Sequence, residues 1–314
     1  MKLLTYVCAA AISATLAAPV AAQSYGIATG NPGTLFHNIG TAVANTANNA
    51  GLRTTVQPAT STNQYIPYVG SGGIDFGVAN LQEVSYAEQG AGWFEGMESP
   101  DLRIVGMIMP LRLGIFTRAD DGIGSIAELE GRPVADGYTA QQTILPLIDG
   151  LLATADLTRD DIESVMVPST SAGADAFMSG EADAFVFAFG AGKVREADAS
   201  VGGLYALPME PTEENLTAMR KYWPTAFFTQ IEGGSTPGVP ETDTYMAYPQ
   251  VVFTHASADE QAVYEMTKAL YEGKDTLTET FKPFAGFNPD DMHGDGGGVK
   301  FHPGALRFYE EKGL

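Results

Sequence analysis

Strands and helices alternate along the first part of this chain. Residues 25–29 have the composition of a short strand, and the glycine-rich turn at 30–34 leads from them into a helix with an apolar face. The next strand ends at Pro58, and a third, buried strand follows Asp75. This alternation predicts an α/β fold built on a parallel sheet.

The same order of elements returns later in the chain. A strand at 132–135, a polar loop and a helix lead to a strand that ends at Pro168, and another buried strand follows Asp183. The spacing of the prolines and aspartates agrees loosely with that of the first copy. We infer two related α/β lobes that face each other, and a chance match between two α/β segments is the alternative.

Residues 1–22 are predicted to form a signal peptide. Lys2 supplies a positive start, residues 3–16 are apolar, and the small residues at 20–22 favour cleavage after Ala22. A membrane anchor is the alternative, but the apolar stretch is short and contains hydroxyl side chains. The only cysteine, Cys8, would be removed, which leaves no disulfide and no thiol nucleophile. We therefore expect a soluble protein exported to the periplasm.

The chain is strongly acidic, with 17 basic and 38 acidic residues and a net charge of −21. Nucleic acid is excluded as a partner because a phosphate-binding surface needs a basic patch, and no cluster of Lys and Arg is present. Anionic membrane surfaces are disfavoured for the same reason. A small anion is not excluded, because neutral hydrogen-bond donors attract it locally.

Polar loops follow the strands in both copies. In open parallel sheets, ligands bind beyond the carboxyl ends of the strands, where loops and helix N-termini expose backbone N–H groups. Each loop taken alone is explained by helix capping, whereas the set favours a ligand cleft between two lobes. The loops comprise residues 30–34, 60–63, 80–82, 138–142, 169–171 and 190–192.

Six short segments carry a more specific pattern. They lie at residues 30–34, 75–80, 125–134, 179–184, 233–239 and 301–305, and the last contains a distinctive His-Pro-Gly-Ala sequence. In order and spacing they resemble the solute receptors of the TAXI branch of tripartite ATP-independent periplasmic (TRAP) transporters. The resemblance implies a type II periplasmic-binding-protein fold, with central sheets flanked by helices and hinge strands between the lobes. Such receptors close like a Venus flytrap on a small organic solute, often a carboxylate or amino acid, and deliver it to a membrane permease.

The resemblance also implies which residues contact the solute. Asn80 stands where these receptors usually have Gln, Thr139 and Gln141 lie in the usual Ser-Gly-Thr segment, and Thr236 replaces a common Tyr. These differences reshape the pocket, so a typical ligand such as glutamate is not implied. The implied contacts are Gly30, Asn31, Gly33, Thr34, Thr62, Asn63, Asn80, Thr139, Gln141 and Thr236, to which we add Gly190 from the last polar loop.

Arg112 lies where the chain is expected to cross from the first lobe to the second. A guanidinium there could bind a carboxylate through two hydrogen bonds, and a solvent-facing arginine on a hinge strand is the alternative. Tyr245 and Tyr248 lie on the expected return crossing. We predict that Tyr248 walls the pocket and that at least one of the two tyrosines packs in the core.

The two crossings set the expected domain order. Residues 23–115 form the first part of lobe 1, residues 116–239 form lobe 2, and residues 240–314 return to lobe 1. The returning part is expected to hold a helix that begins at Ser257, with Glu260 in a capping box.

No catalytic or metal-binding pattern is present in the sequence. The four histidines show no metal-ligand spacing, and His302 is expected to anchor a final helix that begins near Pro303. The acidic loop at 288–298 lacks the spaced ligands of a calcium hand, and no nucleophile elbow or phosphate loop occurs. We predict a receptor without enzymatic activity, metal or cofactor. The receptor half of a system that signals to a membrane kinase is the nearer alternative, and an enzyme with a dispersed site is the remote one.

Overall fold

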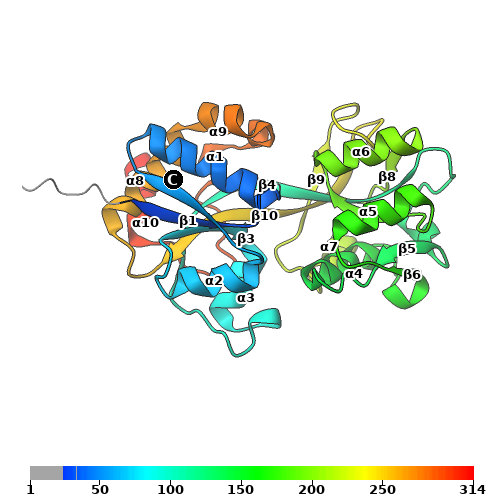
Figure 1. Ribbon diagram of the computed structural model, residues 1–314, viewed down its shortest axis with the longest axis horizontal. Coiled ribbons are helices and arrows are strands. Elements are labelled where there is room, and N and C mark those ends of the chain that lie inside the picture. The colour runs from blue at the N-terminus through cyan, green and yellow to red at the C-terminus, as the bar shows by residue number, and fades with distance from the viewer. Residues whose placement is uncertain (1–23, 33) are drawn as a thin grey trace, which may run out of the picture.

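The computed structural model describes residues 24–32 and 34–314. The predicted signal peptide and Gly33 lie outside the described residues. Figure 1 shows two lobes, each a sheet flanked by helices, joined by two long strands, β4 (Leu102–Arg118) and β10 (Asp243–His255). No helix in the described part of the chain is long and apolar enough to cross a membrane.

The first lobe is a five-stranded sheet covered by helices on both faces. Its strand order is β2-β1-β3-β10-β4, where the first three strands are parallel and β10 is antiparallel to both of its neighbours. The remaining elements are β1 (Tyr25–Thr29), β2 (Thr54–Pro58), β3 (Phe76–Asn80), α1 (Leu35–Asn49), α2 (Thr62–Gly70), α3 (Leu81–Gln89), η1 (Gly92–Phe94), α8 (Glu260–Glu272), α9 (Lys274–Thr280), η5 (Lys282–Gly286), η6 (Pro289–Asp291) and α10 (Pro303–Lys312).

Alternate residues of these strands enter two separate cores. Ile27 and Val78 pack with α1, α8 and α10, whereas their neighbours Ala28 and Ala79 pack with α2 and α3. Successive side chains of a strand point to opposite faces, so a strand buried on both faces consists almost entirely of apolar residues. This is why the sequence of β3 is apolar throughout, except for Asn80 at its end.

The second lobe repeats the strand order of the first. Its strand β5 lies beside β6 in parallel, and a parallel bridge between Val134 and Ala184 connects β5 to the start of β7. The order β6-β5-β7 matches β2-β1-β3, as the repeated sequence pattern predicts. The elements are η2 (Ile126–Leu129), β5 (Pro133–Asp136), η3 (Gln142–Ile144), α4 (Leu145–Ala153), η4 (Arg159–Asp161), β6 (Glu163–Met166), α5 (Thr170–Ser179), β7 (Phe185–Ala188), α6 (Gly192–Val201), β8 (Leu204–Ala206), α7 (Glu213–Arg220) and β9 (Phe227–Ile231).

The pairing of β4 with β10 is interrupted between the lobes. Tyr248 pairs with Leu111, but the next pair joins Gln250 to Ile108, so that Pro249 is skipped on β10 and Met109 with Pro110 on β4. Proline has no N–H to donate to a ladder, which explains why the interruption falls here. β4 and β10 are thus each continuous along the chain, but they are not paired at these three residues, where they pass between the lobes.

The starts of two C-terminal helices differ in how well they were predicted. The expectation that α8 begins at Ser257 is wrong: α8 begins at Glu260, and Oδ1 of Asp259 accepts the N–H of Ala262 at 2.8 Å. The hydroxyl oxygen of Ser257 instead lies 2.9 Å from Nδ1 of His255. The prediction for the final helix is confirmed, because Nδ1 of His302 accepts the N–H of Gly304 at 3.1 Å and α10 begins at Pro303.

Candidate binding cleft

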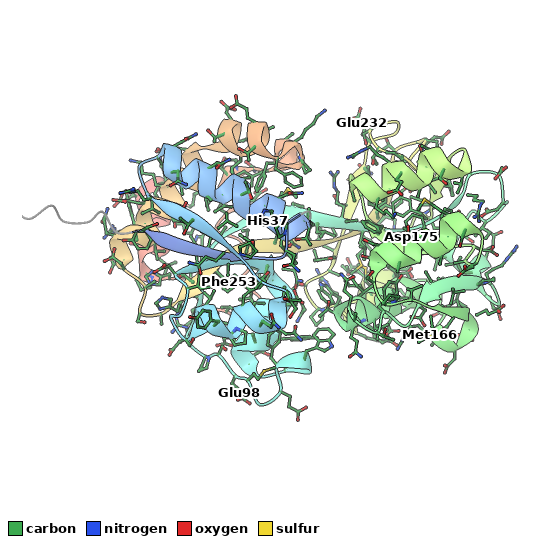
Figure 2. All side chains as sticks on the ribbon, viewed as in Figure 1. His37, Glu98, Met166, Asp175, Glu232 and Phe253 are labelled. Atoms are coloured by element: carbon green, nitrogen blue, oxygen red, sulfur yellow. The ribbon has the colours of Figure 1, made fainter. Side chains whose placement is uncertain are left out.

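A cleft of about 940 Å³ lies between the two lobes. Its walls come from the polar loops that follow β1, β2 and β3 in the first lobe and β5, β6 and β7 in the second, and the hinge strands form part of its lining. The side chains that surround it are drawn in Figure 2, where His37 of α1 lies on the first lobe and Asp175 of α5 on the second.

Eleven of the thirteen predicted contact residues line this cleft. Gly33 lies outside the described residues. Thr236 does not line the cleft: it lies in the turn between β9 and β10, and its buried hydroxyl has no hydrogen-bond partner among the described residues. The eleven are Gly30, Asn31, Thr34, Thr62, Asn63, Asn80, Arg112, Thr139, Gln141, Gly190 and Tyr248.

Several of these polar side chains also hold their own loops. The hydroxyl of Thr34 donates to the carbonyl oxygen of Asn31 at 2.7 Å and caps α1 by accepting the N–H of His37. In the second lobe, Oε1 of Gln141 accepts the N–H of Thr170 at 3.1 Å. The two roles are compatible at Gln141, whose Nε2 forms no hydrogen bond with the described residues, whereas the hydroxyl and the N–H of Thr34 both donate to Asn31.

The charges that line the cleft are opposite in sign to those of the whole chain. Of the 38 acidic residues in the sequence, Glu83 is the one found in the described lining, beside the basic residues Arg112, Lys193 and Arg195. The ammonium of Lys193 pairs with Asp175 at 2.6 Å and with Glu196 at 3.0 Å. Nη1 of Arg195 donates to the carbonyl oxygen of Gly190 at 2.9 Å.

Arg112 differs from the other two cations in having no partner. It lies on β4 and is half-buried, and its guanidinium forms no ion pair or hydrogen bond with the described residues. Burial lowers the pKa of Arg112, but a guanidinium stays charged at any physiological pH. Its five N–H donors are therefore available to a ligand in the cleft.

Glu83 lies in the first turn of α3 and is 2% exposed. Its Oε1 accepts a hydrogen bond of 2.8 Å from the hydroxyl of Thr62, and its Oε2 accepts a short hydrogen bond from Nδ2 of Asn80. Burial raises the pKa of Glu83 to about 7, although both hydrogen bonds favour the charged form. This carboxyl therefore changes its charge near neutral pH.

Both tryptophans of the sequence, Trp93 and Trp223, line the cleft. Trp93 belongs to the first lobe and packs against the core of the second. The ring of Trp223 lies 5.4 Å from that of Tyr248, and its buried Nε1 has no hydrogen-bond partner among the described residues. Tyr245 does not line the cleft and packs against Phe189 in the core, with ring centres 4.7 Å apart.

Glu83, Lys193 and the two tryptophans line the cleft but were not predicted from the sequence. One signal was available for Glu83, since an Asn at the N-cap and a Glu three residues later form a capping pattern that places them side by side. No local pattern marks Trp93 or Trp223, because both reach the cleft through contacts between segments far apart in the sequence.

Solved structures show which class of fold this is. A structure described as a periplasmic transporter has a TM-score of 0.55 and 12% identity, with 92% of each chain covered. The putative sulfonate-binding protein SsuA of Methylobacillus flagellatus KT has a TM-score of 0.52 and 16% identity, with 83% of this chain and 72% of that chain covered. The protein thus has the two-lobed fold of periplasmic binding proteins. The family follows from a separate comparison: the sequence model of the NMT1-like family matches residues 27–313, and the chain belongs to that family.

Proposed function

We propose that this protein is a periplasmic solute-binding receptor that captures a small organic anion, such as a carboxylate, an amino acid or a sulfonate. The observation that carries this proposal is the unpartnered guanidinium of Arg112 in a cleft lined by three basic residues and one acid, within a chain of net charge −21. Neutral donors from the side chains of Asn31, Asn63 and Thr139 add to the attraction for an anion. The carboxylate class is also the one that the TAXI resemblance implies.

The mechanism we propose is closure of the lobes on the bound solute. A ligand that touches both lobes stabilises the closed form by the difference in its affinity for the two forms. The interrupted pairing beside Pro110 and Pro249 gives the strands a point at which to bend. Addition of an anion that binds should therefore reduce the radius of gyration of the protein in small-angle scattering. An unchanged radius with a proven ligand would contradict closure.

For the partner, we propose the membrane permease of a TRAP transporter, on the strength of the six segments that resemble TAXI receptors. A receptor that signals to a membrane kinase is the competing proposal. The two are separated by the genes beside this one, where a large permease supports transport and a sensor kinase supports signalling. Neither partner would change the solute chemically, so the bound compound should be recovered intact.

A thermal-shift screen of organic acids, amino acids and sulfonates tests the proposed ligand class. A ligand at 100 times its dissociation constant stabilises the folded protein by about 2.7 kcal/mol. Asn63→Ala and Thr139→Ala should each remove that shift while the unliganded protein remains folded. Thr217→Ala on α7, an exposed threonine outside the cleft, is the matched control and should keep the shift. Normal binding by both cleft variants would show that the solute binds elsewhere.

A further inference from the structure

We propose that Glu83 couples anion capture to the uptake of one proton, which it binds when the solute enters the cleft. This inference rests on the proposed anion-binding function. Glu83 is then a specificity residue: its neutral carboxylic acid form favours binding of the anion, and its carboxylate form opposes it.

Glu83 lies in the wall of the cleft. Its carboxyl group lines the cleft and connects two elements of its wall, because it accepts hydrogen bonds from Thr62 at the start of α2 and from Asn80 at the end of β3. Both donors are among the residues predicted to contact the solute. Each hydrogen bond that they give to Glu83 is a donor withheld from a ligand.

No cation among the described residues compensates this buried carboxyl group. In the described part of the chain it forms no ion pair with Lys, Arg or His. The titratable groups that face it are the hydroxyls of Tyr65 on α2 and Tyr248 on β10, both with a raised pKa to which the charge of Glu83 contributes. The other elements packed against α3 here, β3 and η1, contain no titratable side chain. An uncompensated buried carboxylate binds a proton readily, as its pKa of about 7 reflects.

A bound anion in the same cleft raises the proton affinity of Glu83 further, because two negative charges in one low-dielectric space repel each other. The proton comes from solvent and binds Oε1 of Glu83. The neutral acid then donates its O–H to the oxygen of Thr62, and the Thr62 hydroxyl turns its own hydrogen toward another acceptor. Asn80 continues to donate to Oε2. Protonation thus converts Thr62 from a donor to Glu83 into a donor for the solute, while it removes the one negative charge of the lining.

A titration without any ligand tests the proton itself. Carboxyl carbons of glutamate labelled with ¹³C are followed by NMR from low to high pH, and the signal of Glu83 is identified by its loss in Glu83→Gln. A midpoint near 7 supports the inference. A midpoint near the ordinary value of about 4.3 would overturn it, whether or not any solute binds.

Binding of butanoate and butane-1-sulfonate then tests the coupling, since both probes remain anionic throughout the range from pH 6 to pH 8. If only the form with neutral Glu83 binds, the dissociation constant should be about tenfold lower at pH 6 than at pH 8. Calorimetry near neutral pH in Bis-Tris and in Tris, neither of which is an anion, should reveal proton uptake on binding, because the measured heat then depends on the ionisation enthalpy of the buffer.

Glu83→Gln distinguishes this role from a purely structural one. The amide reproduces the neutral acid, because its N–H₂ can donate to Thr62 and its oxygen can accept from Asn80. This variant should bind the probe at pH 8 as tightly as the wild type does at pH 6, a gain that lost packing would not produce. Glu88→Gln removes a charge from the less buried end of the same helix and should behave like the wild type.

The outcomes separate this inference from the proposed function. Binding that is independent of pH in the wild type would overturn the coupling and leave the receptor function intact. Failure of both probes, together with failure of the wider thermal-shift screen, would overturn the anion receptor and the coupling with it, while the NMR midpoint would still report the state of Glu83.

Discussion

The backbone N–H of Thr225 donates a hydrogen bond of 3.1 Å to Oε1 of Gln82, and this bond joins the two lobes. Gln82 lies in the first turn of α3, and Thr225 lies in the loop between α7 and β9. Both residues line a second hollow of about 780 Å³, whereas Trp223, two residues before Thr225, lines the main cleft. The segment 223–225 therefore connects the lining of the cleft to a hydrogen bond between the lobes.

Loss of this bond should separate the lobes. Gln82→Ala removes a partly desolvated hydrogen bond worth about 1 kcal/mol, which shifts the equilibrium between the closed and open forms roughly fivefold. Distances between spin labels on α2 and α5 should become longer or more broadly distributed in the ligand-free protein. Gln89→Ala is the matched control, because Gln89 lines the same hollow but donates only to Ser85 of its own helix. Identical distance distributions for the two variants would show that the bond does not hold the lobes.

Replacement of Arg112 should weaken anion binding without unfolding the protein. Arg112→Met keeps the apolar length of the side chain and removes a guanidinium that no other described residue needs. A lost charge-assisted contact costs about 1.5–3 kcal/mol, or roughly 10- to 150-fold in the dissociation constant measured by calorimetry. The control is Arg103→Met on the same strand, whose guanidinium donates to backbone carbonyl oxygens of Pro100 and Leu102. Equal losses in both variants would mean that Arg112 acts through the strand and not through the solute.

The free energy of unfolding should depend on pH through Glu83. Below pH 4.5 the carboxyl is protonated in both states, whereas between pH 4.5 and about 7 only the folded protein keeps the proton. Stability is therefore lost as the pH rises through this window, by on the order of 3 kcal/mol relative to Glu83→Gln. Urea denaturation at a series of pH values measures the difference. Parallel curves for the wild type and this variant would contradict a raised pKa.

Gly40 should tolerate no side chain. It lies on α1, and a Cβ there would clash with Cγ2 of Thr29 on β1, so that Gly40→Ala must push the helix away from the sheet. We expect a loss of about 1–3 kcal/mol in urea denaturation. Gly286→Ala, where a Cβ meets nothing within 4 Å and the backbone needs no positive φ, should change stability by less than about 0.5 kcal/mol.

The strands β1 and β3 could be predicted because they are buried on both faces. Ile27 and Ala28 enter different cores, and the turn and helix after β1 carry ordinary local signals. The repeated order of strands followed from the same patterns. The start of α8 was predicted wrongly because Ser257 and Asp259 are both good caps, and only the contact of Ser257 with His255 decides between them.

The site was predictable as a set of loops but not as a set of interactions. Strand ends in a parallel sheet meet at one edge, so the polar residues after β1, β2 and β3 had to lie close together. That Thr62 and Asn80 donate to the same carboxyl depends on how α2 packs beside α3, which no single segment encodes. Thr236 was carried over by position from the TAXI receptors that the sequence resembles, and its turn lies away from the cleft.

The charges that line the cleft and the net charge of the whole chain have opposite signs, and this difference affects the rate of association. At low ionic strength the net charge of −21 repels an approaching anion over long distances, whereas the attraction of Arg112 acts only close to the cleft. Salt shortens the range of both fields to about 8 Å at physiological ionic strength, which weakens the distant repulsion most. The association rate of an anionic solute should therefore rise with added salt, and the proposed receptor would capture its solute fastest in a saline medium.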